Sequence, residues 1–330
     1  MQELIDYLKK IGIKNYINNL RKSGTSLNLE SLGVKVDGVK LIGKLLKTNP
    51  ILTELNLWGN MIGAEGVELI ADALKTNTTL TSLNLVANHI GDEGIKVITD
   101  ALKLNTTLIT LNLGNNYIGI DGVKLIAELL KTNKKLTNLD VENNNIGDKG
   151  LRLIVEALKN NTTLAFLNIS SNNITDKGLK SLVNFLKINT TLTNLDLTSN
   201  NISVEGIKLI IDALKLNTTL IHLKLRCNSL GNEGVKPIAE FLKTNTTLTH
   251  LDLAVNNIKD QGVKLITKAL KTNETLTSLD LSMNNIGDKG IKLLTDVLKT
   301  NMVLTDLNID DNYTEEEEKK IIEKYQLLCK

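Results

Sequence analysis

Four side chains in the last third of the sequence have types and spacings suited to polar chemistry. His222, Lys224 and Arg226 alternate with leucines, and His250 follows His222 by 28 residues. Because alternate residues of a strand project from the same face, the first three side chains are expected to share one surface. Two imidazoles on adjacent strands could supply half of a zinc site. No third ligand of matching type is evident, so we expect neither a metal nor a cofactor.

The remaining inventory gives little basis for catalysis. The sequence has three histidines, His89, His222 and His250, and lacks the GxSxG, HExxH, P-loop, dinucleotide-binding and CxxC motifs. Cys227 follows Arg226, a neighbour that can activate a thiol, but no histidine that would act as its base can be inferred. We therefore predict that the protein is not an enzyme.

The elements that must position these residues follow from an internal repeat. Leucine recurs every 28 residues without insertion or deletion, at positions 52, 80, 108, 136, 164, 192, 220, 248, 276 and 304. A glycine column keeps the same period, and apolar residues follow it at spacings of three and four, as in Ile95, Ile98 and Leu102. This spacing is helical. Each repeat is therefore predicted to be a short strand, a turn and a helix.

Two asparagine columns are expected to serve the backbone. The column from Asn60 to Asn312 follows each predicted strand, and its amides are expected to hydrogen-bond to unpaired groups of neighbouring turns. The column from Asn77 to Asn301 ends each helix, where asparagine tolerates the left-handed conformation. This helix-ending role explains the recurring Asn-Thr-Thr triplets better than N-glycosylation does.

Stacked repeats of this kind predict one open parallel sheet with right-handed helical crossovers. Helices are wider than strands, so the sheet is expected to line the concave face of a horseshoe and the helices its convex face. We expect an N-terminal helical cap at 1–23, a solenoid at 24–313 and a C-terminal capping helix at 314–330. The solenoid divides into a degenerate first repeat at 24–51, nine full repeats at 52–303 and a partial last repeat at 304–313.

The pattern LxxLxLxxN, followed by a glycine and a helix, resembles the leucine-rich repeat family over residues 24–313. The 28-residue repeat is similar to the ribonuclease-inhibitor-like subfamily. The resemblance implies an α/β right-handed solenoid and a non-catalytic scaffold for protein–protein interaction, such as an adaptor or a bacterial effector acting in a host cytosol. Two alternatives within the family are a GTPase-activating protein and a ribonuclease inhibitor. The sequence is neither cysteine-rich nor built from two alternating repeat lengths, as true ribonuclease inhibitors are.

The predicted concave wall is acidic. The second, fourth, sixth and seventh positions after each leading leucine hold nine carboxylates and two cations, Lys224 and Arg226. The carboxylates are Glu54, Asp140, Glu142, Asp196, Asp252, Asp280, Asp306, Asp310 and Asp311. A protein partner with a basic surface is therefore expected to be attracted to this wall.

Several residues of the wall stand out as candidate partner-binding residues. They are Trp58, Glu142, Phe166, His222, Lys224, Arg226, His250 and Asp310. Two of them have a structural alternative. Lys224 lies between Asp196 and Asp252 in the predicted register and could simply relieve carboxylate repulsion. Trp58 could instead pack under the N-terminal cap.

Lysine columns on the predicted helical side, from Lys47 to Lys299 and from Lys40 to Lys292, could attract polyanions. Because no aromatic residues alternate with them, we expect these lysines only to solvate the surface, and we expect no nucleic-acid partner.

The composition sets the remaining expectations. The 330 residues carry a net charge of +2, which gives no general reason for binding nucleic acid or an anionic membrane. No apolar stretch is long enough for a signal peptide or a membrane helix. The two cysteines, Cys227 and Cys329, suit a reducing compartment better than secretion. We therefore expect a cytoplasmic monomer, either native to its cell or delivered into a host cytosol.

Overall fold

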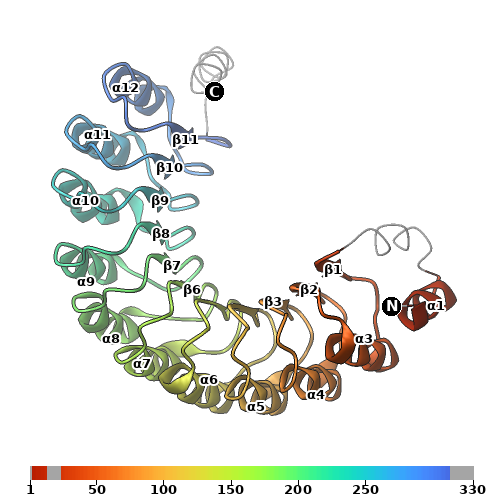
Figure 1. The fold of residues 1–330 in the computed structure, drawn as a ribbon. Helices are drawn as coiled ribbons and strands as arrows, with labels where there is room; N and C mark the ends of the chain where they lie inside the picture. Colours follow the sequence, from red (N-terminus) through yellow and green to blue (C-terminus); the bar gives the residue numbers. More distant parts are fainter. Residues whose placement is uncertain (1, 13–23, 313–330) are drawn as a thin grey trace. The chain divides into compact units, whose positions relative to one another are not determined.

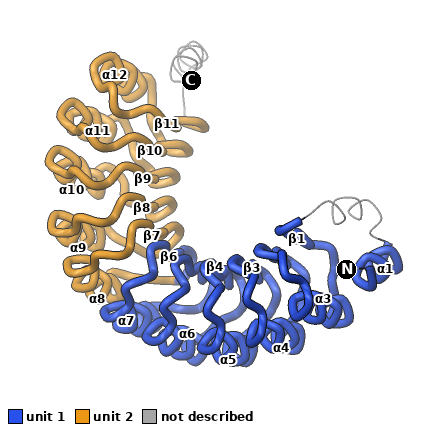
Figure 2. The backbone as a smooth tube through the Cα atoms, viewed as in Figure 1, with its two compact units in different colours: residues 1–172 blue, residues 173–330 orange. Residues whose placement is uncertain are grey.

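The computed structural model describes residues 2–12 and 24–312 (Figure 1). The chain divides into two compact units, residues 1–172 and residues 173–330 (Figure 2). The predicted C-terminal capping helix at 314–330 and residues 13–23 of the predicted N-terminal cap lie outside the described residues.

The first unit contains a parallel sheet of six strands in chain order, with neighbouring strands in register at a shift of 28 residues. Its helices pack side by side in a second layer (Figure 1). The strands are β1 (Ser26–Asn28), β2 (Glu54–Asn56), β3 (Ser82–Asn84), β4 (Thr110–Asn112), β5 (Asn138–Asp140) and β6 (Phe166–Asn168). The helices are α1 (Gln2–Lys10), α3 (Val36–Thr48), α4 (Gly63–Leu74), α5 (Gly91–Leu102), α6 (Ile120–Thr132) and α7 (Gly147–Leu158).

The second unit repeats this arrangement with five parallel strands and a layer of five helices among its described residues. The strands are β7 (Asn194–Asp196), β8 (His222–Lys224), β9 (His250–Asp252), β10 (Ser278–Asp280) and β11 (Asp306–Asn308). The helices are α8 (Asp176–Leu186), α9 (Val204–Leu214), α10 (Gly231–Leu242), α11 (Asp260–Leu270) and α12 (Asp288–Leu298). Both units therefore have the predicted α/β architecture of a leucine-rich-repeat solenoid.

The core lies between the two layers of each unit. The apolar residues predicted from the third repeat to fill it, which run from Leu83 to Leu102, are all at most 2% exposed. Burial of these aliphatic side chains supplies most of the driving force for stacking, because one repeat alone cannot cover its own apolar face. Helix α1 packs against α3 and buries Leu4, Ile5 and Leu8.

The asparagines that follow the strands make the predicted ladder. The side-chain amide of Asn88 donates to the carbonyl oxygens of Leu57, Leu85 and Val86 at 2.9, 3.0 and 3.0 Å. Its backbone N–H donates to Oδ1 of Asn116, one repeat further, at 2.9 Å. The same bonds recur along each unit and tie every turn to the next one, so the predicted structural role is confirmed.

The prediction of left-handed asparagines at the helix ends is wrong. Asn77 and its equivalents are not among the residues with positive φ, and Asn49 and Asn133 are extended. Instead, the Asn77 amide donates to the Leu46 carbonyl of the preceding repeat at 2.7 Å, and Oδ1 accepts from the N–H of Leu80 at 2.8 Å. Because this amide is already bonded inside the repeat array, the structural reading of the Asn-Thr-Thr triplets is favoured over glycosylation.

The helices begin in two ways. Four of them start at a glycine with positive φ: Gly63, Gly91, Gly147 and Gly231. Four others start after an extended residue whose backbone N–H donates to a side chain of the preceding repeat. These pairs are Gly119 to Asp92, Ser203 to Asp176, Lys259 to Asn232 and Gly287 to Asp260. For the four helices that start at a glycine, the residues equivalent to these acceptors are Val36, Ala64, Ile120 and Val204. Their side chains cannot accept a hydrogen bond.

The strands are shorter than expected. Each spans three residues, so β8 ends at Lys224, and Arg226 lies in the turn that follows rather than on the strand. The seventh position after each leading leucine is left-handed, as at Cys227 and Val255, with φ of 56° and 55°. Within the described residues, no helix combines the length and the apolar composition needed to cross a membrane.

Candidate functional site

The candidate site is the surface of the sheet that faces away from the helices, called the strand wall. It comprises the side chains at the second, fourth, sixth and seventh positions after each leading leucine. In the second unit, Lys224 lies in register between Asp196 and Asp252, as predicted. Its Nζ is 3.4 Å from Oδ2 of the buried Asp196, and within the described residues it forms no ion pair with Asp252. The expected ladder is therefore one-sided.

The Asn and Asp residues of the Lys224 column share a backbone role that sequence reasoning missed. In this column, Oδ1 of Asp196, Asp252 and Asp280 accepts from the backbone N–H two residues later at 2.8 to 2.9 Å. Asn56 and Asn308 do the same at 3.0 and 3.1 Å. This bond bends the chain off the strand. The Lys224 side chain has no acceptor, so it cannot make the hydrogen bond to the backbone N–H two residues later that its equivalents make.

Asp252 is held in an unfavourable electrostatic environment. Burial raises the pKa of its carboxyl above the ordinary value, and the nearby carboxylate of Asp280 adds to the increase. The hydrogen bond from the Ala254 N–H and the charges of Arg226 and Lys224 act in the opposite direction without cancelling the effect. The fold therefore disfavours the charged form of this side chain.

The imidazoles of His222 and His250 stack, with ring centroids 3.9 Å apart and an interplanar angle of 21°. Nδ1 of His250 is 2.7 Å from Oγ1 of Thr249. Burial, the second imidazole and the charge of Lys224 lower the pKa of His222, which favours a neutral ring. In the part of the chain that is described, no three His, Cys, Asp or Glu residues group in a way that could hold a metal ion.

Arg226 extends along the wall across two repeats. Its Nη2 lies 3.1 Å from Sδ of Met283, a weak acceptor, with the small Ala254 at the equivalent position of the repeat between them. The backbone N–H of Met283 in turn donates to the carbonyl oxygen of Asp310 at 2.8 Å. Asp310, whose side chain is exposed, thus lies in the turn after β11, next to the repeat that holds Met283. Of the predicted site residues in this unit, the structure places His222, Lys224 and His250 side by side on two neighbouring strands, and it places Arg226 and Asp310 in the turns after β8 and β11.

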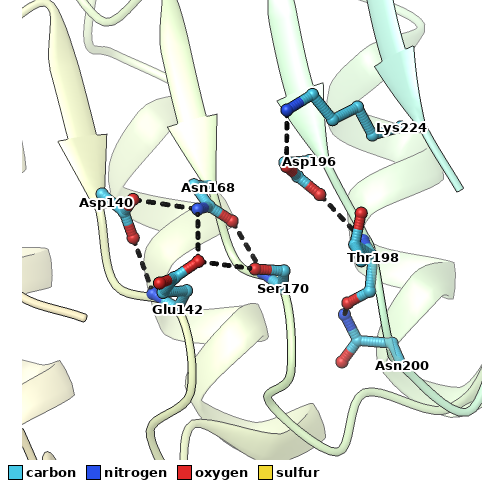
Figure 3. A network of polar contacts seen from close by, with 8 residues as sticks. All are labelled: Asp140, Glu142, Asn168, Ser170, Asp196, Thr198, Asn200 and Lys224. Carbon is cyan, nitrogen blue, oxygen red and sulfur yellow. Dashed lines mark hydrogen bonds and ion pairs between the residues drawn. The ribbon is translucent and has the colours of Figure 1, made fainter. Parts of the chain in front are cut away.

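The strand wall of the first unit holds a separate polar cluster (Figure 3). The side-chain amide of Asn168 donates to Oδ2 of Asp140 at 2.9 Å and to Oε2 of Glu142 at 3.2 Å. The hydroxyl of Ser170 donates to the same Glu142 oxygen at 3.4 Å. Phe166, at the start of β6, is half-buried. Sequence reasoning selected Glu142 and Phe166 but missed Asn168, which matches the Asn or Asp typical of its column, and Ser170, whose column is variable and gives no signal.

Trp58 lies in the turn after β2 and is 41% exposed. The alternative that Trp58 packs under a cap is therefore not favoured. Its carbonyl oxygen accepts from the N–H of Ser31 at 2.7 Å, so the backbone at this position is fixed while the indole contacts solvent. Trp58 belongs to the first unit, whereas His222, Lys224, Arg226, His250 and Asp310 belong to the second.

Many, but not all, of the lysines of the helical side are paired with carboxylates. Six of the lysines that end the helices lie 2.6 to 2.8 Å from a carboxylate three residues earlier. The pairs are Lys103–Asp100, Lys131–Glu128, Lys159–Glu156, Lys215–Asp212, Lys243–Glu240 and Lys299–Asp296. Exposed pairs of this kind add little stability, but they neutralise the charge that a polyanion would need.

Comparison with known proteins supports the same class. The family described as leucine-rich repeat matches residues 48–71, 76–98, 104–127, 132–155, 244–266 and 272–294. The family described as TMOD/LMOD leucine-rich domain matches residues 144–251. A comparison with curated proteins gives no match.

Three solved structures match this chain at low sequence identity. The leucine-rich repeat-containing protein LegL7 from Legionella pneumophila is 20% identical, with a TM-score of 0.55 over 84% of this chain and 89% of that chain. The complex of Rad7 and Elc1 in yeast is 17% identical, with a TM-score of 0.47 over 96% and 91%. Actin-binding site 2 of leiomodin-1 is 22% identical, with a TM-score of 0.36 over 63% and 97%. Its 28-residue repeats, its fold and the two family matches identify the chain as a leucine-rich repeat protein.

Proposed function

We propose that the protein is a non-catalytic recognition scaffold whose strand wall binds a partner protein with a basic surface. The observation that carries this proposal is the presence of an aspartate at position 252, where an asparagine would make the same backbone hydrogen bond. Asn56 and Asn308 make the same backbone hydrogen bond in their repeats without a charge. The carboxylate of Asp252 is therefore unnecessary for the fold, which disfavours its ionisation. Groups kept in such an environment mark functional surfaces.

The distribution of unpaired charge supports the same surface. The carboxylates of α9, α10 and α12 that pair with lysines are neutralised on the helical side. On the strand wall of the second unit, Asp306 and Asp310 are exposed, and within the described residues neither forms an ion pair. A basic partner would thus be attracted to the strand wall rather than to the helices.

Within this wall we propose two recognition roles. The pair of Lys224 and Arg226 interrupts the carboxylates, so it would accept an acidic residue of the partner and fix the register in which the partner lies. The stacked rings of His222 and His250 would supply a flat, mostly neutral contact beside that strip. In the first unit, Glu142 and the half-buried Phe166 would extend the contact surface.

A matched pair of variants tests the proposal. The wall variant carries Asp252→Asn, Asp280→Asn and Asp310→Asn, and the helix variant carries Asp212→Asn, Glu240→Gln and Asp296→Asn. Each loses three negative charges in the second unit and keeps the size of its side chains. Captures from a cell lysate with the wild-type protein and both variants, after confirming equal folding, should show a partner lost only by the wall variant. Equal capture by both variants, or loss only from the helix variant, would contradict the proposal.

We further propose that the scaffold acts in the cytoplasm as an adaptor or as an effector in a host cytosol. The richness in asparagine, lysine and isoleucine and the scarcity of cysteine are compatible with this location. Tagged full-length protein expressed in cultured host cells should fractionate with cytosolic markers and retain the partner captured above. Recovery mainly in a secreted fraction would contradict this part of the proposal.

A further inference from the structure

A second unusual surface lies in the turns after β2, β3 and β4 of the first unit. Met61, His89 and Tyr117 occupy equivalent positions of three consecutive repeats. Met61 is 70% exposed and Tyr117 is 65% exposed. The ring centroids of His89 and Tyr117 are 5.2 Å apart. These three side chains form an exposed line, called the turn ridge, that is separate from the strand wall of the second unit.

The backbone at the turn ridge disfavours the residues found there. Met61, His89 and Tyr117 have φ of 50°, 57° and 58°, which is the left-handed region. In the second unit the equivalent residues Ser229 and Asn257 are also left-handed, whereas Asn201 and Asn285 are not, so this conformation is common in the turn but is not required by the fold. Asparagine tolerates it through local hydrogen bonding, whereas longer side chains gain no such compensation. The turn ridge therefore carries large side chains at positions where the fold favours small polar ones.

Carboxylates border the turn ridge. The first turns of α4, α5 and α6, which follow the three residues directly, carry the exposed residues Glu65, Glu93 and Asp121. The equivalent positions in α7 and α8 are Lys149 and Lys177. Asp121 pairs with Lys124 at 2.7 Å, whereas Glu65 and Glu93 form no ion pair within the described residues. The large side chains and the negative charges thus occur together in these three repeats, and acidic residues also occupy the equivalent positions Asp37, Glu205 and Glu233.

We propose that the turn ridge docks an amphipathic segment of a partner protein, with aliphatic residues on its contact side and lysine or arginine beside them. The thioether of Met61 and the ring of Tyr117 would be covered by the aliphatic residues. The cations would lie against the ring of Tyr117 and against the carboxylates of Glu65 and Glu93. The proposal does not depend on the strand wall of the second unit, since none of these residues belongs to it.

Trp58 provides a local reporter for the test. It is the only tryptophan of the chain, and it is exposed three residues before Met61. The probe is a short synthetic helical peptide of leucine, lysine and alanine, with leucines along one face and lysines flanking them. Titration of the full chain should change the tryptophan fluorescence saturably. The same peptide with glutamate in place of lysine should give no saturable change.

The decisive variant replaces the three side chains with the residue that the turn favours: Met61→Asn, His89→Asn and Tyr117→Asn. The peptide should bind it at least about tenfold more weakly, because exposed anchors of this size dominate small interfaces. Its melting temperature should equal or exceed that of the wild-type protein. Unchanged affinity would overturn the proposal. A lower melting temperature would overturn it as well, since the side chains would then serve the fold.

Two further variants complete the test. One measures the contribution of charge to peptide binding, and the other distinguishes binding at the turn ridge from binding at the strand wall. Glu65→Lys with Glu93→Lys introduces the residue found at the equivalent positions in α7 and α8, and it should weaken binding of the basic peptide. The wall variant described above should bind the peptide with wild-type affinity. Equal binding of the acidic and basic peptides, or loss of binding only in the wall variant, would contradict docking at the turn ridge.

Discussion

Asparagine side chains in the turns connect each repeat to its neighbours through hydrogen bonds to backbone carbonyls. Asn116 is fully buried, and its amide donates to the carbonyl oxygens of Leu85, Leu113 and Gly114 at 2.8 to 3.0 Å. Substitution Asn116→Ala leaves these carbonyls without their donor, which is expected to cost about 2–5 kcal/mol of unfolding free energy. Urea denaturation measures the loss. The exposed neighbour Asn115→Ala is the control, and an equal loss from both variants would contradict the ladder's role.

Asp252 is the residue at which stability and recognition are expected to oppose each other. Asp252→Asn keeps the acceptor for the Ala254 N–H and removes a charge that burial and Asp280 disfavour. We therefore predict a higher melting temperature for this variant at neutral pH. Asp196→Asn is the matched control, because that substitution removes the partner of Lys224 instead. A variant Asp252→Asn that melts lower than the wild-type protein would contradict the assigned environment.

The stability difference between Asp252→Asn and the wild-type protein is expected to depend on pH. The pKa of Asp252 is raised in the folded state, so the folded protein binds this proton more tightly than the unfolded chain. The wild-type protein loses the corresponding stability as the pH rises from the ordinary value of 3.8 through the folded pKa. The stability advantage of Asp252→Asn should grow across this window and then level off. Denaturation at a series of pH values measures the difference, and a constant difference would contradict the prediction.

At the scale of the element, the two kinds of helix start predict different tolerance to substitution. Gly231 begins α10 with φ of 57°, whereas Gly287 precedes α12 with φ of −95° and ψ of −174°. A Cβ added at Gly287 would meet its nearest atom, Oδ1 of Asp260, at an ordinary 3.5 Å. Gly231→Ala should therefore cost about 1–2 kcal/mol of unfolding free energy, because only glycine adopts the left-handed region readily. Gly287→Ala should cost much less. Comparable losses in urea denaturation would contradict the distinction.

The repeat period was sufficient to predict the elements, because one strand, one turn and one helix recur in phase and the apolar residues reveal which faces are buried. The start of each helix could not be predicted in this way. Gly119 and Gly231 have the same residue type at equivalent positions, and their conformations differ because Asp92 accepts a hydrogen bond one repeat earlier whereas Val204 cannot. The residue that decides the conformation is distant in sequence.

For the candidate site, the sequence predicts only which residues lie beside each other on neighbouring strands. The 28-residue period placed Lys224 beside Asp196 and His222 beside His250, and the strands confirm both pairs. The contact of Arg226 with Met283 crosses two repeats and depends on how a long side chain lies over Ala254. Rotamers of long exposed side chains are not encoded in a periodic pattern, so this contact could not be derived from the sequence.

At the scale of the whole molecule, the two surfaces of the repeats differ in their charges. The balanced composition hides this arrangement, since 39 basic and 37 acidic residues nearly cancel. On the helical side, lysines and carboxylates pair within the same helix, as Lys215 and Asp212 do. On the strand wall of the second unit, carboxylates outnumber cations. The proposed recognition of a basic protein therefore rests on the position of the charges rather than on the net charge.

Carbodiimide labelling of carboxylates in the captured complex tests this central claim most directly. Asp306 and Asp310 represent the strand wall of the second unit, and Asp212 and Asp296 represent its helical side. All four side chains are exposed in the protein alone. Mass spectrometry of labelled peptides should show that the partner protects Asp306 and Asp310 and leaves Asp212 and Asp296 as reactive as before. Protection of Asp212 and Asp296, with unchanged labelling of Asp306 and Asp310, would contradict recognition through the strand wall.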